Sequence, residues 1–203
     1  NVFNHRYSTL IRGSVDYKTD PKVLFRTIVQ NFTNAFLLGH LHWIDQDMFY
    51  TSDEKSAELM AICRAMSGGP VYVSDVIKEI NTKYLSPLIY NDGKIVGTLA
   101  PGVPLPESME SDPFFNNKAF RVVAPLKNNS AAIMVVNLNS SGSVKTSVSP
   151  KDYSWANALI QPYQQPWSAP KEGLVMYDYH NKKANVFAAD HQFELGVQEV
   201  RLL

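Results

Sequence analysis

Residues 8–44 read STLIRGSVDYKTDPKVLFRTIVQNFTNAFLLGHLHWI and contain a strand-like run, a helical run and a second strand-like run. Ser8–Ile11 predicts the first strand. Apolar residues at helical spacing predict a helix over Val23–Leu38, with Asp20 as its N-cap. Leu41–Ile44 predicts the second strand. Strands that alternate with helices are typical of parallel β/α units, so this stretch indicates an α/β fold.

A third β/α unit is predicted from the residues that follow. Thr51 with Glu54 fits a capping box for a helix that Gly68-Gly69 ends, and Pro70–Val73 predicts the third strand. Three such strands leave an unpaired edge, and a complete (β/α)₈ barrel takes about 250 residues. We therefore expect the chain to be part of a longer polypeptide, whose remainder is absent, cleaved or present as another chain.

The pattern changes to β structure after the turn signal Asn91-Asp92-Gly93. Short strand-like runs separated by turn clusters then recur at Lys94–Leu99, Phe120–Ala124, Ala131–Leu138, Ser143–Val148, Gly173–Tyr179, Ala184–Ala188 and Val197–Leu203. Regular short strands suggest an antiparallel β-sandwich. The sequence thus predicts an α/β domain over residues 1–93 and an all-β domain over residues 94–203.

The chain has 203 residues, with 19 Lys plus Arg against 19 Asp plus Glu. This charge balance argues against a nucleic-acid partner and a polybasic membrane surface. No apolar run reaches the roughly 18 residues of a membrane span, so we expect no membrane insertion. An apolar fraction of 45% is too high for a disordered chain, and a single cysteine excludes an intrachain disulfide framework. Because no signal-peptide pattern opens the sequence, we expect a cytoplasmic location.

Polar and aromatic side chains follow the three predicted strands, at Arg12–Tyr17, His42–Phe49 and Ser74–Asp75. Chemistry in parallel β/α folds collects at the carboxyl ends of the strands. Glycoside cleavage needs two carboxylates, and an arginine fork can hold hydroxyls or carboxylates beside them. From the residues alone, Asp16 is equally well read as a catalytic carboxylate or an ordinary loop residue, and Asp75 as a pocket residue or a cap.

Other candidate side chains have plainer explanations. His40 and His42 alternate on one predicted strand, where hydrogen bonding to a sugar is favoured over metal binding because no third ligand is evident. We expect neither a metal nor a cofactor. Four aromatic residues of the second domain are expected to pack in a core or a domain interface rather than to form a sugar-binding strip. They are Tyr153, Trp155, Tyr163 and Trp167.

The motifs of the first domain resemble those of the raffinose synthase and seed-imbibition family, which belongs with the retaining α-galactosidases. Asp45–Phe49 resembles the family's W-D-M-F segment, and Arg64–Asp75 resembles its R-A-x-S-G-G-P-x-Y-V-S-D segment. Arg12–Tyr17 resembles its R-x-S-x-D motif followed by Tyr or Phe. Leu88–Ile95 is similar to its L-P-D-G-S-I-L stretch, so the close likeness runs from about Arg12 to Ile95.

The resemblance implies that the chain is the C-terminal portion of such a protein. The implied fold is the last β/α units of a (β/α)₈ TIM barrel followed by an antiparallel β-sandwich. The implied activity is that of a glycosidase acting on terminal α-galactosyl groups by double displacement. Asp16 maps onto the family's general acid/base, and Arg12 maps onto the arginine that contacts the sugar and holds this carboxylate.

The resemblance also implies a set of substrate-binding residues. Asp45, Asp47 and Met48 map onto the segment that lines the galactose pocket in related α-galactosidases. Trp43 is a further substrate-binding candidate, although it stands apart from the position of the tryptophan in the plant-type enzymes.

The family's nucleophilic aspartate lies in a K-x-D segment at the end of an earlier strand. Lys18-Thr19-Asp20 matches that string, but Asp20 precedes Pro21 and is better explained as a helix cap. We therefore expect the nucleophile upstream of Asn1, outside this chain.

Three functions follow, in descending rank. The first is hydrolysis of an oligosaccharide or other galactoside by an α-galactosidase-like enzyme. The second is galactosyl transfer of the raffinose-synthase kind, ranked lower because Asp45-Gln46-Asp47-Met48 departs from the plant W-D-M-F form. The third is a non-catalytic carbohydrate-binding remnant, ranked last because Arg12, Asp16 and both pocket aspartates are present together.

Overall fold

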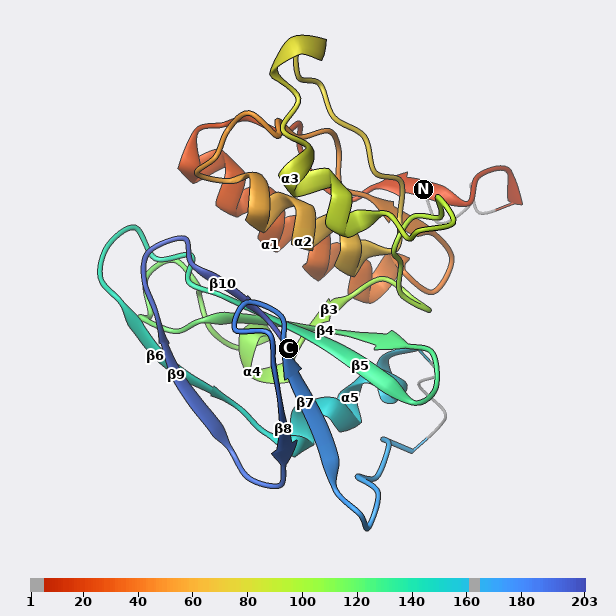
Figure 1. The fold of residues 1–203 in the computed structure, drawn as a ribbon, viewed down its shortest axis with the longest axis vertical. Coiled ribbons are helices and arrows are strands. Elements are labelled where there is room, and N and C mark those ends of the chain that lie inside the picture. The colour runs from red at the N-terminus through yellow and green to blue at the C-terminus, as the bar shows by residue number, and fades with distance from the viewer. Residues whose placement is uncertain (1–5, 161–164) are drawn as a thin grey trace. The chain divides into compact units, whose positions relative to one another are not determined.

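The computed structural model describes residues 6–160 and 165–203, and the chain divides into two compact units between Gly102 and Val103 (Figure 1). The predicted strand at Lys94–Leu99, which opened the expected second domain at residue 94, is wrong. This segment belongs to the first unit and makes a single bridge, between Ile89 and Ile95. The Asn91–Gly93 turn forms as predicted, with Gly93 at φ 83°, but the strands do not continue beyond that bridge.

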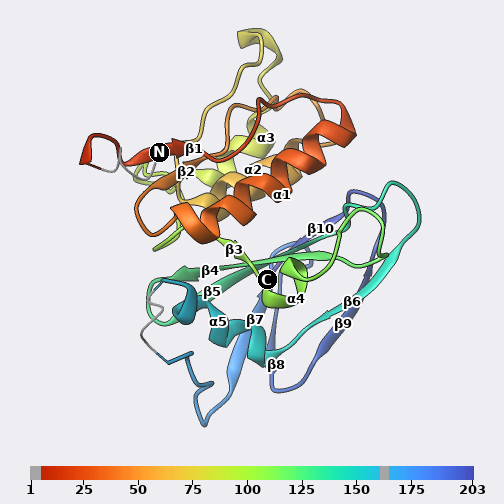
Figure 2. The same ribbon diagram turned by 180° about the vertical axis from the view of Figure 1, so that it is seen from behind.

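The first unit alternates strands and helices, and α1 and α2 lie side by side in both views (Figures 1 and 2). Its elements are β1 (Leu10–Arg12), α1 (Pro21–Leu38), β2 (Trp43–Asp45), α2 (Ala57–Ser67) and α3 (Thr82–Leu85), with 3₁₀ turns at Ile77–Glu79 and Ser86–Leu88. β1 and β2 pair in parallel, with Arg12 opposite Asp45. The predicted third strand is reduced to one parallel bridge, between Phe49 and Val73.

Helix α1 forms where its apolar spacing predicts it. The carboxylate Oδ1 of Asp20 accepts hydrogen bonds from the backbone N–H groups of Lys22 and Val23, at 3.0 and 3.2 Å. The interpretation of Asp20 as a cap is therefore confirmed. Leu24, Ile28 and other apolar residues on one face of the helix are buried, which holds α1 against β2.

Helix α2 begins later than predicted. Thr51 does not cap it, because the Thr51 hydroxyl donates to Asp75 and accepts from the backbone N–H of Asn81. The helix spans Ala57–Ser67, and Gly68 follows it as a left-handed cap with a φ of 62°, so the predicted end of the helix is confirmed. Cys63, the single cysteine, is completely buried in α2, and burial raises the pKa of its thiol to about 12.

The second unit is built mainly from antiparallel strands. Its elements are β3 (Val103–Pro104), α4 (Pro106–Met109), β4 (Phe120–Leu126), β5 (Ser130–Val136), β6 (Val144–Val148), α5 (Pro150–Ile160), β7 (Leu174–Asp178), β8 (Lys183–Phe187), β9 (His191–Leu195) and β10 (Val200–Leu202). One sheet has the order β10-β5-β4-β3, and two ribbons pair β6 with β9 and β7 with β8 (Figure 1). The unit is built from strands as predicted, except that it also contains the helices α4 and α5. Two of its strands, β3 and β9, were not predicted.

Helix α5 packs on β4 and β5 in the second unit. Tyr153 of α5 is buried, and its ring lies 5.4 Å from that of Trp167, which packs against the apolar core. The packing interpretation of these two residues is therefore confirmed. Trp155 is half-exposed, and Tyr163 lies outside the described residues.

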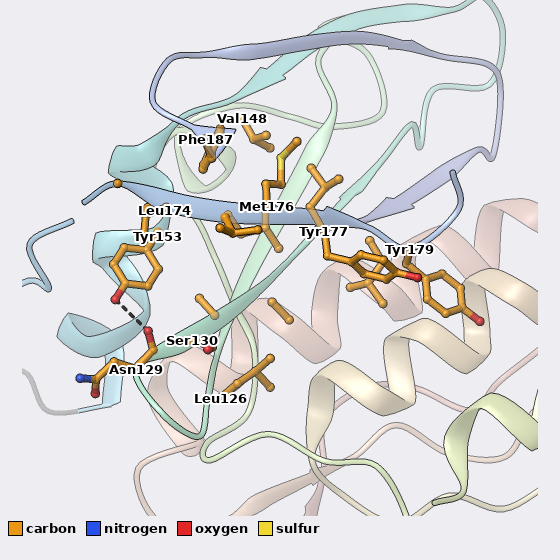
Figure 3. A pocket seen from close by; sticks show the side chains of 17 residues that line it. Leu126, Asn129, Ser130, Val148, Tyr153, Leu174, Met176, Tyr177, Tyr179 and Phe187 are labelled. Carbon is orange, nitrogen blue, oxygen red and sulfur yellow. Dashed lines mark hydrogen bonds between the residues drawn. The ribbon is translucent and has the colours of Figure 1, made fainter. Parts of the chain in front are cut away.

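An apolar cavity of about 540 Å³ lies between β5 and the β7–β8 ribbon (Figure 3). Its lining includes Ile133, Met176 and Phe187, and the Tyr153 hydroxyl donates to the Asn129 carbonyl at 2.8 Å on one side. Its lining holds no carboxylate, histidine or cysteine. Across the part of the chain that the structure describes, no helix is long and apolar enough to cross a membrane.

Candidate active site

Arg12 gathers three carboxylates at the carboxyl ends of β1 and β2. Its Nε lies 3.3 Å from Asp45 Oδ2, and its Nη1 lies 2.9 Å from Asp47 Oδ2 and 3.3 Å from Asp16 Oδ1. The parallel register places Arg12 directly opposite Asp45, so local strand pairing brings the first pair together. We call Arg12, Asp16, Asp45 and Asp47 the arginine–carboxylate cluster.

The three carboxylates of the cluster differ sharply in exposure. The side chain of Asp16 is 90% exposed, whereas those of Asp45 and Asp47 are 22% and 10% exposed. Asp47 also accepts hydrogen bonds from the backbone N–H groups of Tyr17, at 2.7 Å, and Met48, at 2.8 Å. Asp47 is thus held from several sides, while Asp16 contacts Arg12 and otherwise faces solvent.

The loop that carries Asp47 has a strained backbone held by a buried arginine. Asp47 has a φ of 68°, which residues with a side chain rarely adopt. Nη2 of the completely buried Arg64 donates to the carbonyls of Gln46, Asp47 and Met48, at 2.9, 2.9 and 2.8 Å. Burial lowers the pKa of Arg64 to about 10, so the side chain is still a cation at neutral pH.

Tyr72 joins the cluster from the predicted third strand. Its hydroxyl donates to Asp45 Oδ1 at 2.8 Å and accepts from Arg12 Nη2 at 3.4 Å. Burial and the bond to Asp45 raise the pKa of Tyr72 to about 12. Neither Tyr72 nor Arg64 was singled out from the sequence, although both lie in the Arg64–Asp75 motif. That motif was the available signal.

The two remaining predicted binding residues lie at the edge of this arrangement. Met48 contributes its backbone N–H to Asp47, and its side chain is half-buried. The Trp43 ring packs against Gly68, where an added Cβ would lie 2.4 Å from Trp43 Cζ3. Among the described residues, no hydrogen bond or ion pair joins the Trp43 side chain to Arg12. The structure therefore brings Asp16, Asp45 and Asp47 together around Arg12 but leaves Trp43 apart from these polar contacts.

Asp75 has a cap-like role. Its carboxylate accepts hydrogen bonds from the backbone N–H groups of Thr51 and Ser52, both at 2.8 Å, and from the Thr51 hydroxyl at 3.0 Å. Burial alone would raise the pKa of Asp75, but these bonds outweigh it and hold the pKa below its ordinary value of 3.8. Asp75 thus joins the segment after β2 to the segment after Val73.

The two histidines do not alternate on a strand as predicted, because β2 begins only at Trp43. His42 is buried, with 4% of its surface exposed, whereas His40 lies exposed in the turn after α1. Within residues 6–160 and 165–203, no group of three or more His, Cys, Asp or Glu side chains is arranged to hold a metal ion.

Solved structures share the fold of this chain. A GH27 β-L-arabinopyranosidase from Geobacillus stearothermophilus, in complex with arabinose, matches 99% of the chain and 46% of its own length, with a TM-score of 0.68 and 15% identity. The α-galactosidase I from Mortierella vinacea matches 98% of the chain and 53% of its own length, with a TM-score of 0.59 and 17% identity. These likenesses concern the fold alone.

Sequence comparison finds plant relatives. "Probable galactinol–sucrose galactosyltransferase 6" of Arabidopsis thaliana is 37% identical over 55% of the chain, and the galactinol–sucrose galactosyltransferase of Pisum sativum is 29% identical over 81%. The matches span only 15% and 22% of the length of these two relatives. The model of the family described as raffinose synthase or seed imbibition protein Sip1 matches residues 4–161. Because that match covers well over half of the sequence and contains the whole arginine–carboxylate cluster, the chain belongs to the raffinose synthase and seed imbibition protein family.

Proposed function

We propose that this chain is part of an enzyme that acts on terminal α-galactosides by a retaining, two-carboxylate mechanism. The single observation that supports this most strongly is the arginine–carboxylate cluster, with Asp16 exposed beside a cation that two less exposed carboxylates hold in place. Membership of the family and the likeness to a solved α-galactosidase support the substrate class.

In this mechanism Asp16 is the general acid/base. An exposed carboxyl group can give a proton to the leaving oxygen and later remove one from the acceptor. Arg12 orients Asp16 through the 3.3 Å contact and offers its remaining N–H, on Nη2, to a sugar hydroxyl. Arg12, Asp45, Asp47, Met48 and Trp43 are the proposed substrate-binding residues.

The second carboxylate is proposed to come from outside this chain. The oxygens of Asp45 accept from Arg12, Tyr72 and the Asp47 N–H, and those of Asp47 accept from Arg12 and two backbone N–H groups. Carboxylates held this way are suited to positioning rather than to attack on the anomeric carbon. The nucleophile is therefore assigned to the remainder of a longer polypeptide or to another chain.

The proposed fold of the complete protein extends the two units described here. Residues 1–93 supply the last β/α units of a (β/α)₈ TIM barrel, and the second unit supplies an antiparallel β-sandwich. The parallel pairing of β1 with β2, the alternation with α1 and α2, and the likeness to GH27 enzymes support this assignment. The expected location is the cytoplasm.

The test uses Asp16→Asn in the full-length polypeptide. We expect a loss of about 10²- to 10⁴-fold in kcat/KM on galactosides with poor leaving groups, because these need a proton from the acid/base. The loss on p-nitrophenyl α-galactoside is expected to be much smaller for the galactosylation step. Asp92→Asn, which changes an exposed aspartate in a turn, is the matched control. Unchanged rates of the Asp16→Asn protein on both substrates would contradict the assignment.

Galactosyl transfer is a second candidate. It is favoured by the curated relatives, which are named galactosyltransferases and are more similar in sequence than the solved glycosidases. Incubation of the full-length protein with galactinol and sucrose separates the candidates, since a trisaccharide product indicates transfer and free galactose indicates hydrolysis. Binding of galactosides without either product would instead indicate a carbohydrate-binding protein.

A further inference from the structure

The hydroxyl of Tyr72 lies where two members of the arginine–carboxylate cluster meet. It donates to Asp45 Oδ1 at 2.8 Å and accepts from Arg12 Nη2 at 3.4 Å. The hydroxyl therefore acts both as donor and as acceptor toward the cluster. The Tyr72 side chain comes from the segment after α2, so a third part of the chain contributes to a site otherwise built after β1 and β2.

Asp45 is the junction of these contacts. Its Oδ1 accepts from Tyr72 and from the backbone N–H of Asp47, both at 2.8 Å, and its Oδ2 accepts from Arg12 Nε at 3.3 Å. A hydrogen bond to a carboxylate fixes the carboxylate's rotation, so the Tyr72 hydroxyl helps to decide where Oδ2 meets Arg12. Removal of the hydroxyl would take one donor from Asp45 and one acceptor from Arg12.

Arg12 needs this support because its side chain is long and 36% exposed. A free guanidinium at such a site samples several rotamers, and each fixed contact restricts them. Nε and Nη1 are held by Asp45, Asp47 and Asp16, whereas Nη2 points to Tyr72. With a pKa raised to about 12, the phenol of Tyr72 is protonated at neutral pH, as an ordinary tyrosine also is, so it can donate to Asp45.

We propose that Tyr72 is a positioning residue for the reaction proposed above: its hydroxyl orients Asp45, and Asp45 holds the Arg12 guanidinium where it pairs with Asp16. This inference rests on the proposed function for its effect on turnover. The contact between Tyr72 and Asp45 is independent of that function. Tyr72 acts through Asp45, so the effects of changing the two residues are coupled.

The experiment compares four full-length proteins: the wild type, Tyr72→Phe, Asp45→Ala and the double variant. Tyr72→Phe keeps the ring and removes only the hydroxyl. We expect it to lower kcat for methyl α-galactoside, whose poor leaving group needs the acid/base, about tenfold, with KM changed by less than about twofold, as one charge-assisted hydrogen bond is worth roughly that factor. In the Asp45→Ala background, where no side-chain oxygen is left to accept from the hydroxyl, the same substitution is expected to lower kcat by less than about twofold. Tyr90→Phe, at an exposed tyrosine of the same unit, is the control and should leave kcat unchanged.

Equal losses in the two backgrounds, or no loss in either, would overturn the inference. The melting temperatures of the same four proteins give a second reading that needs no activity. A lower melting temperature for Tyr72→Phe that disappears in the Asp45→Ala background supports the contact, and equal decreases overturn it. If the wild type turns over no galactoside, the proposed function fails, while the melting temperatures still decide whether Tyr72 acts through Asp45.

Discussion

Gly68 meets two separate requirements at one position. Its φ of 62° lies in the left-handed region, which a side chain makes costly. In addition, a Cβ at this position would lie 2.4 Å from the Trp43 ring and 2.8 Å from the Thr98 hydroxyl. Gly68 thus stops α2 and leaves the space into which the ring of Trp43, the first residue of β2, packs.

The two requirements at Gly68 can be separated by comparison with Gly93. Gly93 also has a positive φ, 83°, but an added Cβ there would meet nothing within 4 Å. We expect Gly93→Ala to cost about 1 kcal/mol of unfolding free energy from backbone strain alone, and Gly68→Ala about 3 kcal/mol because steric overlap adds to that strain. Urea unfolding of the two variants measures the difference. Equal losses would show that the Trp43 ring moves aside at no cost.

At the level of residues, sequence motifs located most of the candidate site but not all of it. Arg12, Asp16, Asp45 and Asp47 were selected together, and the structure places them within ion-pair distance. Tyr72 was missed because its role depends on a contact with Asp45, which is 27 positions away in the sequence. A single sequence contains no direct signal for such a contact.

Asp75 connects two loops of the first unit without belonging to a helix or strand. The bonds it accepts from Thr51 and Ser52 hold its pKa below 3.8, although burial acts in the opposite direction. The unfolded chain therefore takes up a proton at Asp75 at a higher pH than the folded chain does. The resulting stabilisation is complete above the ordinary pKa and is lost as the pH falls through the lowered pKa.

Asp75→Asn tests this account of the loop connection. We expect the variant to be less stable than the wild type at pH 6 and the difference between them to shrink as the pH falls from about 4 to 2, because only the wild type loses the contribution of the carboxylate. Urea unfolding at several pH values measures this difference. Glu54→Gln, which removes an exposed carboxylate of the same unit, is the control for the loss of a carboxylate elsewhere in that unit. A stability difference between Asp75→Asn and the wild type that stays the same from pH 6 to pH 2 would contradict the assignment of this stabilisation to the Asp75 carboxylate.

Elements with strong local signals were predicted well, and elements that depend on distant partners were not. α1 has a regular apolar face and a cap at Asp20, both readable locally. α5 contains Tyr, Ser, Trp and Asn, which are weak helix formers, and it packs on β4 and β5. β9, with the sequence His-Gln-Phe-Glu-Leu, is paired along its whole length with β6, more than 40 residues earlier.

At the scale of the molecule, the candidate site and the apolar core of the β-rich unit lie in different units. The first contains the whole arginine–carboxylate cluster, and the second has its own apolar core around Val123, Val135 and Phe187. The alternation of strands and helices followed by short strands predicted two such units. The structure divides the chain after Gly102 rather than after residue 93, because Lys94–Leu99, despite an apolar pattern typical of a strand, pairs among the described residues only with the neighbouring residues Leu88–Tyr90 of the first unit.

Because Cys63 is buried, the rate at which its thiol reacts with a reagent reports how often the first unit opens. The thiol is fully buried in the first unit with a pKa of about 12, and the second unit contains no cysteine. A thiolate reagent such as DTNB can therefore react only when the first unit opens. We expect negligible modification of the native chain at pH 8, and a rate that rises with urea in step with loss of α2. Rapid, complete modification without urea would contradict this. The labelling time would thus report the opening of the first unit separately, even while the signal of the β-rich second unit persists.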